Sequence, residues 1–269
     1  NPLTARVMAN RAWHHLFGQG LVPTVDNFGQ MGERPSHPAL LDHLAHRFMN
    51  SDWSIKDLVR DLMLSKTYRM SSAHNDAAEA IDPNNRLVWR MSVRRLQVEP
   101  LRDAMLTVSG RLSTERPEGS PVMSTPISDM RKATQNASPE NMTCRTVYLP
   151  VFRGFVPQVF QAFDFAEPSQ VMGRRDVTTV STQALYFMNN EFVIKESEHA
   201  AKRLLAERLQ EDRLNTAYQW TLGRKPTTEE AARATAYLTD IESPKLSSAQ
   251  QWGSLFQALF ASAEFRYLQ

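Results

Sequence analysis

The chain has 269 residues, of which 42% are hydrophobic and 22% are charged. These proportions are typical of a globular protein, and the length is enough for one large domain or two smaller ones. The 31 basic residues are nearly balanced by 29 acidic ones, so the net charge is only +2 and argues against nucleic-acid binding. Because no apolar run approaches the ~20 residues that cross a bilayer, we expect no membrane span.

Cys144 is the one cysteine of the chain, which excludes an intramolecular disulfide and a thiolate metal cluster. We expect this cysteine to pack as a small apolar residue. The sequence begins at Asn1 and shows no signal-peptide pattern. We therefore expect it to be a piece of a longer protein whose targeting information lies upstream.

Start and stop signals predict a series of helices in the N-terminal half. Asn1 and Pro2 suit a helix start, and Gly18 suits its end. Pro38 suits the first turn of a second helix, and Ser54 followed by Asp57 resembles a capping box. The predicted helices are about 3–17, 38 through 48, 55 through 63, 83 through 91 and 98–109, the last ending at Gly110.

A long Pro-, Ser- and Thr-rich segment follows, without sustained hydrophobic periodicity. It predicts a loop over residues 111–145, and such loops are either functional or disordered. Thr146–Phe152 has the composition of a short strand, and Asp176–Gln183 is a second segment prone to extended structure.

Helical periodicity returns after residue 183. The predicted helices are 183–189, 191–209, 214–222, 227 through 238 and 248 through 268, with capping signals at Thr227–Glu230 and Ser247. The fold class expected is mainly α: a compact multi-helix domain with one or two short strands and the long loop. We divide it into an N-terminal helical region over residues 1–110, the loop over residues 111–145 and a C-terminal helical region over residues 146–269, which form one domain or two subdomains.

Seven histidines raise the question of a metal site. His43 and His46 lie three residues apart on a predicted helix, with Asp42 nearby. The same side chains also suit the polar outer face of that helix, which we favour, since such spacings arise often by chance. Neither His-Glu-x-x-His nor Cys-x-x-Cys-His occurs. We therefore expect no metal and no cofactor in this chain.

Arginines recur every four residues on the predicted helix from Pro83, at Arg86, Arg90 and Arg94. Acidic residues follow at Glu99 and Asp103, with Arg102 between them. One interpretation is an ion-pair network that joins two helices. The other is a site for an acidic ligand such as sulfate, phosphate or uronate, which arginine binds in a bidentate way.

A second polar cluster surrounds Asp164, which lies between two phenylalanines. This setting is compatible with a raised pKa and a general acid or base, or with a carboxylate that caps a turn. Arg174, Arg175 and Gln183 follow. These donors suit either a polar ligand or the carbonyl groups of the chain itself.

The stretch Asn10–Pro38 is dense in Trp, His, Gly, Asp and Pro, and many shorter segments accompany it. With these segments the chain resembles the domain-of-unknown-function 1553 family, the C-terminal module of planctomycete proteins that often carry a cytochrome c domain. The similar segments are Asp82–Arg90, Arg94–Glu99, Leu101–Asp103, Ser109–Gly110, Tyr148–Arg153, Phe163–Phe165, Gly173–Val180, Gln183–Leu185, Met188–Asn189 and Leu222–Glu229.

The resemblance implies a module of a multidomain protein that is periplasmic, in the cell envelope or secreted. Any haem would lie in an upstream domain, and upstream domains of the same polypeptide would be partners. The family is linked through its genomic context to the use of sulfated polysaccharide, so an anionic glycan is a further partner to consider.

Our leading hypothesis is a helical accessory module, either structural or ligand-binding. The alternative is an enzymatic domain that acts on an anionic or sulfated polysaccharide, alone or with a redox partner domain. Candidate catalytic residues are Asp26, His37 and Asp164. Candidate ligand-binding residues are Arg86, Arg90, Arg94, Glu99, Arg102, Asp103, Arg153, Arg174, Arg175 and Gln183. A protein-docking surface is a third hypothesis, for which a large exposed apolar patch would be the sign.

Overall fold

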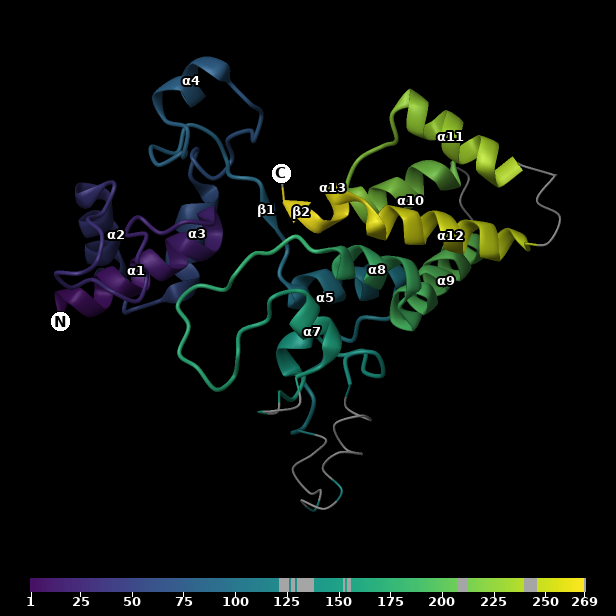
Figure 1. The fold of residues 1–269 in the computed structure, drawn as a ribbon, viewed down its shortest axis with the longest axis horizontal. Coiled ribbons are helices and arrows are strands. Elements are labelled where there is room, and N and C mark those ends of the chain that lie inside the picture. Colours follow the sequence, from purple (N-terminus) through teal and green to yellow (C-terminus); the bar gives the residue numbers. More distant parts are fainter. Residues whose placement is uncertain are drawn as a thin grey trace. The chain divides into compact units, whose positions relative to one another are not determined.

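A computed structural model describes residues 1–120, 126, 129, 138–151, 153, 156–207, 212–239 and 246–268 (Figure 1). The chain forms two compact units. The N-terminal unit comprises Asn1–Arg94 with Met172–Arg174, and the C-terminal unit comprises Arg95–Val171 with Arg175–Leu268. Helices dominate both units, which confirms the mainly α class. Because the units divide after Arg94, the helix predicted over residues 98–109 belongs to the C-terminal unit.

The N-terminal unit contains four helices among its described residues: α1 (Pro2–Phe17), α2 (Pro38–Asn50), α3 (Ile55–Leu64) and α4 (Asp76–Ile81). The first three agree with the sequence prediction. The Asn1 side chain accepts the Leu3 N–H at 2.9 Å, and Gly18 ends α1 with a φ of 86°. Ser54 caps α3 by accepting the Asp57 N–H at 3.2 Å. Helix α4 was not predicted.

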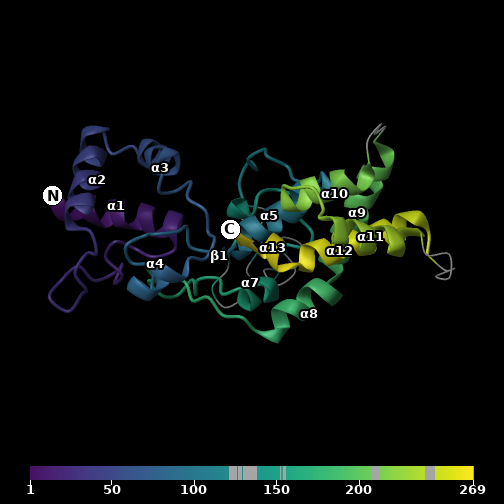
Figure 2. The same ribbon diagram turned by 90° about the horizontal axis from the view of Figure 1, so that it is seen from above.

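Packing of α1 against α2 and α3 forms the core of the N-terminal unit, and these helices lie together in both views (Figure 1, Figure 2). Trp13 and Phe17 stack in this core with their ring centroids 3.9 Å apart. Asn10 is fully buried and pairs with both backbone groups of Val22, at 2.8 and 3.0 Å. This pairing fixes the loop that leaves α1, because a buried amide must satisfy its hydrogen bonds.

The predicted helix from 83 through 91 is wrong. The Asp82 carboxylate accepts the N–H groups four and five positions later, at 3.0 and 2.7 Å. Asn85 accepts the N–H four positions later at 2.9 Å, and both Asn85 and Val88 have positive φ, at 50° and 57°. Asp and Asn side chains compete with helical hydrogen bonds in this way, so they form turns where hydrophobic spacing suggests a helix.

The C-terminal unit consists of longer helices with short segments before them. Its described elements are α5 (Val98–Ser109), η2 (Thr146–Tyr148), α7 (Gln158–Ala162), α8 (Ser181–Asn189), α9 (Glu191–Ala206), α10 (Arg213–Leu222), α11 (Thr228–Thr239), α12 (Ser248–Ala261) and α13 (Ala263–Arg266), with strands β1 (Arg94–Arg95) and β2 (Tyr267–Leu268). Helix α5 ends at Gly110 as predicted, with a φ of 76°.

Helices α9 and α12 pack along each other and form the centre of the C-terminal core (Figure 1). Ala200, Ala201 and Gly253 are buried there, and small side chains let the two helix backbones approach closely. Large side chains from α5, α7 and α8 surround this pair, among them Met105, Phe160 and Phe187. Cys144 is buried at the edge of the same core, as expected.

The short strands occur at places other than those predicted. Thr146–Tyr148 forms a turn of 3₁₀-helix, and Phe152 lies outside the described residues. The segment before Ser181 is extended but unpaired in any described ladder, and α8 begins at that residue. The strands are β1 and β2, which pair with each other.

Two further predicted spans fall partly outside the described residues: the loop 111–145 at 121–125, 127–128 and 130–137, and the helix 191–209 at its last two positions. The predicted final helix divides at Ser262, which separates α12 from α13. The Ser262 side chain accepts the Phe265 N–H at 3.2 Å and so caps α13.

Arg102 organises the segment that leads to η2. Its side chain is 2% exposed and donates to the carbonyl oxygens of Pro139 at 2.8 Å and Cys144 at 3.0 Å, and to that of Met142. It also donates to the Thr146 hydroxyl at 3.0 Å. A planar guanidinium with five donors can satisfy several carbonyls of an irregular segment at once.

We expect Arg102→Leu to lower the free energy of unfolding by about 3 kcal/mol or more, because several buried carbonyls lose their donor together. Urea denaturation at neutral pH measures this. Arg213→Leu is the matched control, since Arg213 is exposed, and should change the free energy by less than about 0.5 kcal/mol. Equal effects of the two substitutions would show that Arg102 does not support the segment.

Candidate functional site

Asp164 and Arg95 form a largely buried ion pair in the C-terminal unit. Their side chains are 14% and 5% exposed, and Arg95 donates to Asp164 Oδ2 at 2.5 Å. Thr178 donates to the same carboxylate from its N–H at 2.9 Å and from its hydroxyl at 2.8 Å. Arg95 also donates to the Thr178 carbonyl. The pair thus joins the start of this unit to the extended segment before α8.

The pKa of Asp164 is lower than usual, the opposite of the raised pKa that the general acid or base interpretation requires. Burial acts to raise it, but the hydrogen bonds from Thr178 and Arg95 and the charge of Arg95 outweigh burial. The backbone of Asp164 is also unusual, with a φ of 57°. Asp164 is therefore a fixed anion that connects a tight turn to its neighbours, which is the turn-forming interpretation.

Glu99 and Arg175 form a second pair close to the first in sequence. Arg175 donates from both terminal nitrogens to the two oxygens of Glu99, each at 2.7 Å. Both side chains are 23% exposed, and the guanidinium lies 4.7 Å from the centroid of the Phe165 ring. Two parallel hydrogen bonds together with a stacking ring fix the orientation of Arg175.

Gln183 completes this group from α8. It is 2% exposed and donates to the carbonyls of Ala162 at 2.9 Å and Thr178 at 3.1 Å. The structure thus brings side chains from Arg95–Glu99 together with side chains from Asp164–Gln183. It pairs their donors with acceptors of the chain.

Asp103 and Arg153 are the other candidates in the C-terminal unit. Asp103 accepts the N–H and the hydroxyl of Thr146, at 2.8 and 2.6 Å, so it supports the same segment as Arg102. Arg153 is exposed. The carboxylate of Asp103 therefore has structural partners, whereas Arg153 faces solvent.

The arginine stripe predicted at Arg86, Arg90 and Arg94 is absent from the described structure because these residues lie on turns and β1. Arg86 is exposed, and Arg90 lies 4.7 Å from the centroid of the Trp89 ring. Arg94 donates to the His15 carbonyl at 2.5 Å. These three side chains therefore have different surroundings, and all belong to the N-terminal unit.

The remaining candidates of the N-terminal unit are Asp26, His37 and Arg174. Asp26 is exposed and accepts the Gly173 N–H at 2.7 Å. His37 precedes α2, and its Nδ1 lies 3.0 Å from the Ser36 hydroxyl oxygen. Arg174 is exposed on the segment that Asp26 holds. The structure thus joins Asp26 to the neighbour of Arg174, a relation across 147 positions.

No group of three or more His, Cys, Asp or Glu side chains among the described residues is arranged to hold a metal ion. His43 and His46 are exposed on α2. Within the same portion of the chain, no helix has both the length and the apolar character to cross a membrane.

The sequence analysis did not identify an open groove of about 530 Å³ among α10, α11 and α12. Tyr218, Tyr237 and Leu255 contribute apolar surface to it, and Glu230 and Arg233 contribute charge. This volume lies within the range of small-ligand sites. The residues of the groove come from three helices, so sequence spacing alone gives little sign of it.

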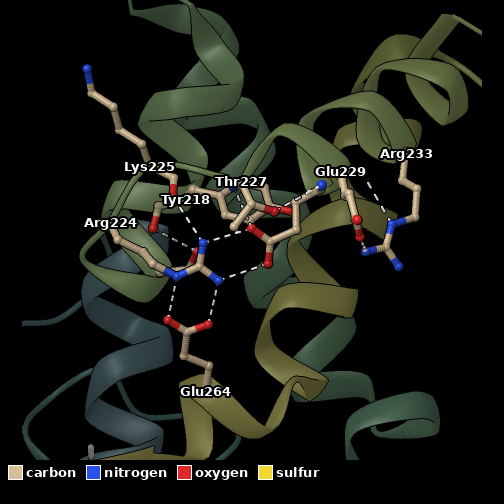
Figure 3. Close-up of polar contacts among 9 residues, drawn as sticks. Tyr218, Arg224, Lys225, Thr227, Glu229, Arg233 and Glu264 are labelled. Carbon is tan, nitrogen blue, oxygen red and sulfur yellow. Dashed lines mark hydrogen bonds and ion pairs between the residues drawn. The ribbon is translucent and has the colours of Figure 1, made fainter. Parts of the chain in front are cut away.

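Arg224 and two carboxylates form a polar cluster (Figure 3), of which Glu230 lines this groove. Arg224 donates to both oxygens of Glu264 at 2.6 Å and to both oxygens of Glu230 at 2.7 and 2.8 Å. These bonds, with the Thr227 N–H, lower the pKa of Glu230 to about 2. One guanidinium faces two carboxylates, so this cluster carries a net negative charge and disfavours an anion.

Thr227 and Glu230 also confirm the predicted capping box of α11. The Thr227 hydroxyl accepts the Glu230 N–H at 3.3 Å, and the Thr227 N–H donates to Glu230 at 2.7 Å. No local pattern indicated the partner Glu264, which lies 40 positions from Arg224.

Residues 1–238 match the model of a family described as protein of unknown function (DUF1553). The chain belongs to the DUF1553 family. The match covers the N-terminal unit and most of the C-terminal unit. No curated protein and no solved structure matches this DUF1553 chain.

We expect Asp164→Asn to lower the free energy of unfolding by about 2 kcal/mol at pH 7. Asparagine tolerates the positive φ, so the substitution removes mainly the charge. Because the folded pKa of Asp164 lies below its unfolded value, the carboxylate stabilises the fold above the unfolded pKa, and this stabilisation is lost as the pH falls through the folded pKa.

Chemical denaturation at neutral and at acidic pH measures this difference between wild type and variant. Asp176→Asn is the matched control, because Asp176 is an exposed carboxylate on the neighbouring segment. A difference for Asp164→Asn that stays constant down to acidic pH would contradict the charged role of Asp164.

Proposed function

We propose that this DUF1553 chain is a helical accessory module of a larger secreted or envelope protein. Upstream domains of the same polypeptide are its partners, and any haem lies in them, as in the planctomycete-type architecture with cytochrome c. The module presents surfaces for contact with these domains and holds them in place. In this proposal the paired arginines of the C-terminal unit are structural.

The observation that carries this proposal is the pairing of Arg95, Arg102 and Arg175. Arg95 and Arg175 donate to carboxylates, and Arg102 donates to carbonyls within the same unit. A site for an anionic glycan keeps its guanidinium donors directed at the ligand. These three arginines instead direct donors to acceptors of the chain, which supports the scaffold.

The charge state of Asp164 also favours the accessory module over an enzymatic domain for anionic or sulfated polysaccharide. A general acid must hold its proton near the working pH. The lowered pKa of Asp164 works against this role. Its hydrogen bonds to Thr178 and Arg95 also occupy both carboxylate oxygens.

We expect Arg175→Gln to lower the free energy of unfolding by about 1–2 kcal/mol, between the values for exposed and buried pairs, because Glu99 loses its partner. Binding of dextran sulfate should stay as in the wild type. Urea denaturation and isothermal titration calorimetry measure the two quantities. The double variant Glu99→Gln with Arg175→Gln should recover part of the lost stability.

Arg153→Gln is the control, since it removes the same charge from an exposed site of the same unit. It should leave the stability unchanged within about 0.5 kcal/mol. If Arg175→Gln abolished dextran sulfate binding without loss of stability, the arginine would be a ligand-binding residue and the structural role would be refuted.

A further inference from the structure

Positively charged side chains gather at the C-terminal end of α1 in the N-terminal unit. His14 and His15 occupy its last turn, and Arg11 lies one turn before them. The Arg94 side chain crosses Gly18, where a Cβ would lie only 2.7 Å from Arg94 Cδ, and donates to the His15 carbonyl at 2.5 Å. Glycine at this position therefore allows the guanidinium to approach the helix end.

Arg174 joins this group from a distant region of the sequence. Asp26 accepts the N–H of Gly173 at 2.7 Å, and this bond holds the short segment Met172–Arg174 in the N-terminal unit. A Cβ at Gly173 would overlap the Asp26 carboxylate, so a larger residue there would displace this side chain. Asp26 therefore positions Arg174, and its carboxylate is engaged with the backbone.

Two buried polar atoms of this group have no hydrogen-bond partner among the described residues: Nδ1 of His14 and Nε of Arg94. Buried polar atoms in folded proteins are nearly always paired, and an orphaned one costs free energy. The two atoms belong to neighbouring cationic side chains. Both would be donors when His14 is protonated, so the partner that fits them is an acceptor.

The electrostatic surroundings of His14 point the same way. Its pKa is lowered to about 4, first by burial and then by His15, Arg174, Arg94 and Arg11. All four of these neighbours carry or can carry a positive charge. Burial lowers the pKa of Arg94, and the neighbouring Tyr68 hydroxyl acts in the opposite direction. An imidazolium is unfavourable here unless a negative charge arrives.

We propose that His14, Arg94 and Arg174 form a binding site for a small oxyanion, a sulfate, phosphate or carboxylate group. His14 donates from Nδ1 once protonated, Arg94 donates from Nε, and the Arg174 guanidinium supplies the exposed side of the site. The anion takes the place of the missing acceptor and the missing counter-charge together. Binding of the anion and protonation of His14 are therefore coupled.

This inference rests on the proposed function in one respect, since it gives the accessory module a ligand. It concerns the N-terminal unit and uses none of the paired arginines of the C-terminal unit. Its experiment follows a single imidazole, whereas the test of the proposed function follows unfolding free energies and binding after substitution of Glu99 and Arg175. Failure of one is thus distinct from failure of the other.

The experiment is an NMR titration of the histidine imidazoles of the full chain against pH, in sodium sulfate and in sodium chloride at equal ionic strength. The His14→Gln variant assigns the His14 signal. We expect sulfate to raise the pKa of His14 by about one pH unit. This rise corresponds to a tenfold higher affinity of sulfate for the protonated imidazole than for the neutral one. His43 and His46, exposed on α2, are the internal control and should titrate alike in both salts.

Arg174→Gln should remove most of this rise, because it deletes a donor without touching the core. A repeat in sodium acetate distinguishes a tetrahedral oxyanion from a carboxylate as the preferred ligand, and a response to either supports the site. No response of His14 to either anion would overturn the proposal. So would an equal response of His43, or a rise that Arg174→Gln leaves intact.

Discussion

The buried guanidinium of Arg102 is the interaction on which residues 139–146, which lead into η2, depend. These residues have little regular structure, so their carbonyl groups need partners outside a helix or a ladder. Arg102 supplies several of them from a rigid position on α5, and Asp103 supplies the acceptor for Thr146. The irregular backbone is therefore held by a helix that the sequence specifies strongly at both ends.

The same principle explains the segment that leads to α8. The turn at Asp164 and the extended chain before Ser181 form no ladder among the described residues, yet Arg95 and Thr178 connect them to each other. Arg175 does the same through Glu99. Removing either member of such a pair leaves the other charge uncompensated in a partly buried position. Substitution in these pairs is therefore expected to lower the stability of the fold rather than to change ligand binding.

Local signals in the sequence predicted the helices well and the tertiary partners poorly. Asn1, Gly18, Ser54 and Gly110 act through groups within a few residues, so caps and ends could be read directly. The turns after Asp82 failed because side-chain hydrogen bonds competed with a helical hydrophobic pattern. Of the candidate site, the sequence indicated the arginines and acids but not their pairing: Arg95 and Asp164 lie 69 positions apart, and no local rule joins them.

The partners of the arginine side chains differ between the two units, and the functional proposals depend on this difference. In the C-terminal unit a guanidinium at each described buried position meets a carboxylate or several carbonyls, so its charge is already used by the fold. At the end of α1 the cations act on one another instead, and His14 Nδ1 and Arg94 Nε have no partner in the part of the chain that the structure describes. An external anion at the end of α1 would supply both an acceptor and a negative charge that the described residues there do not supply.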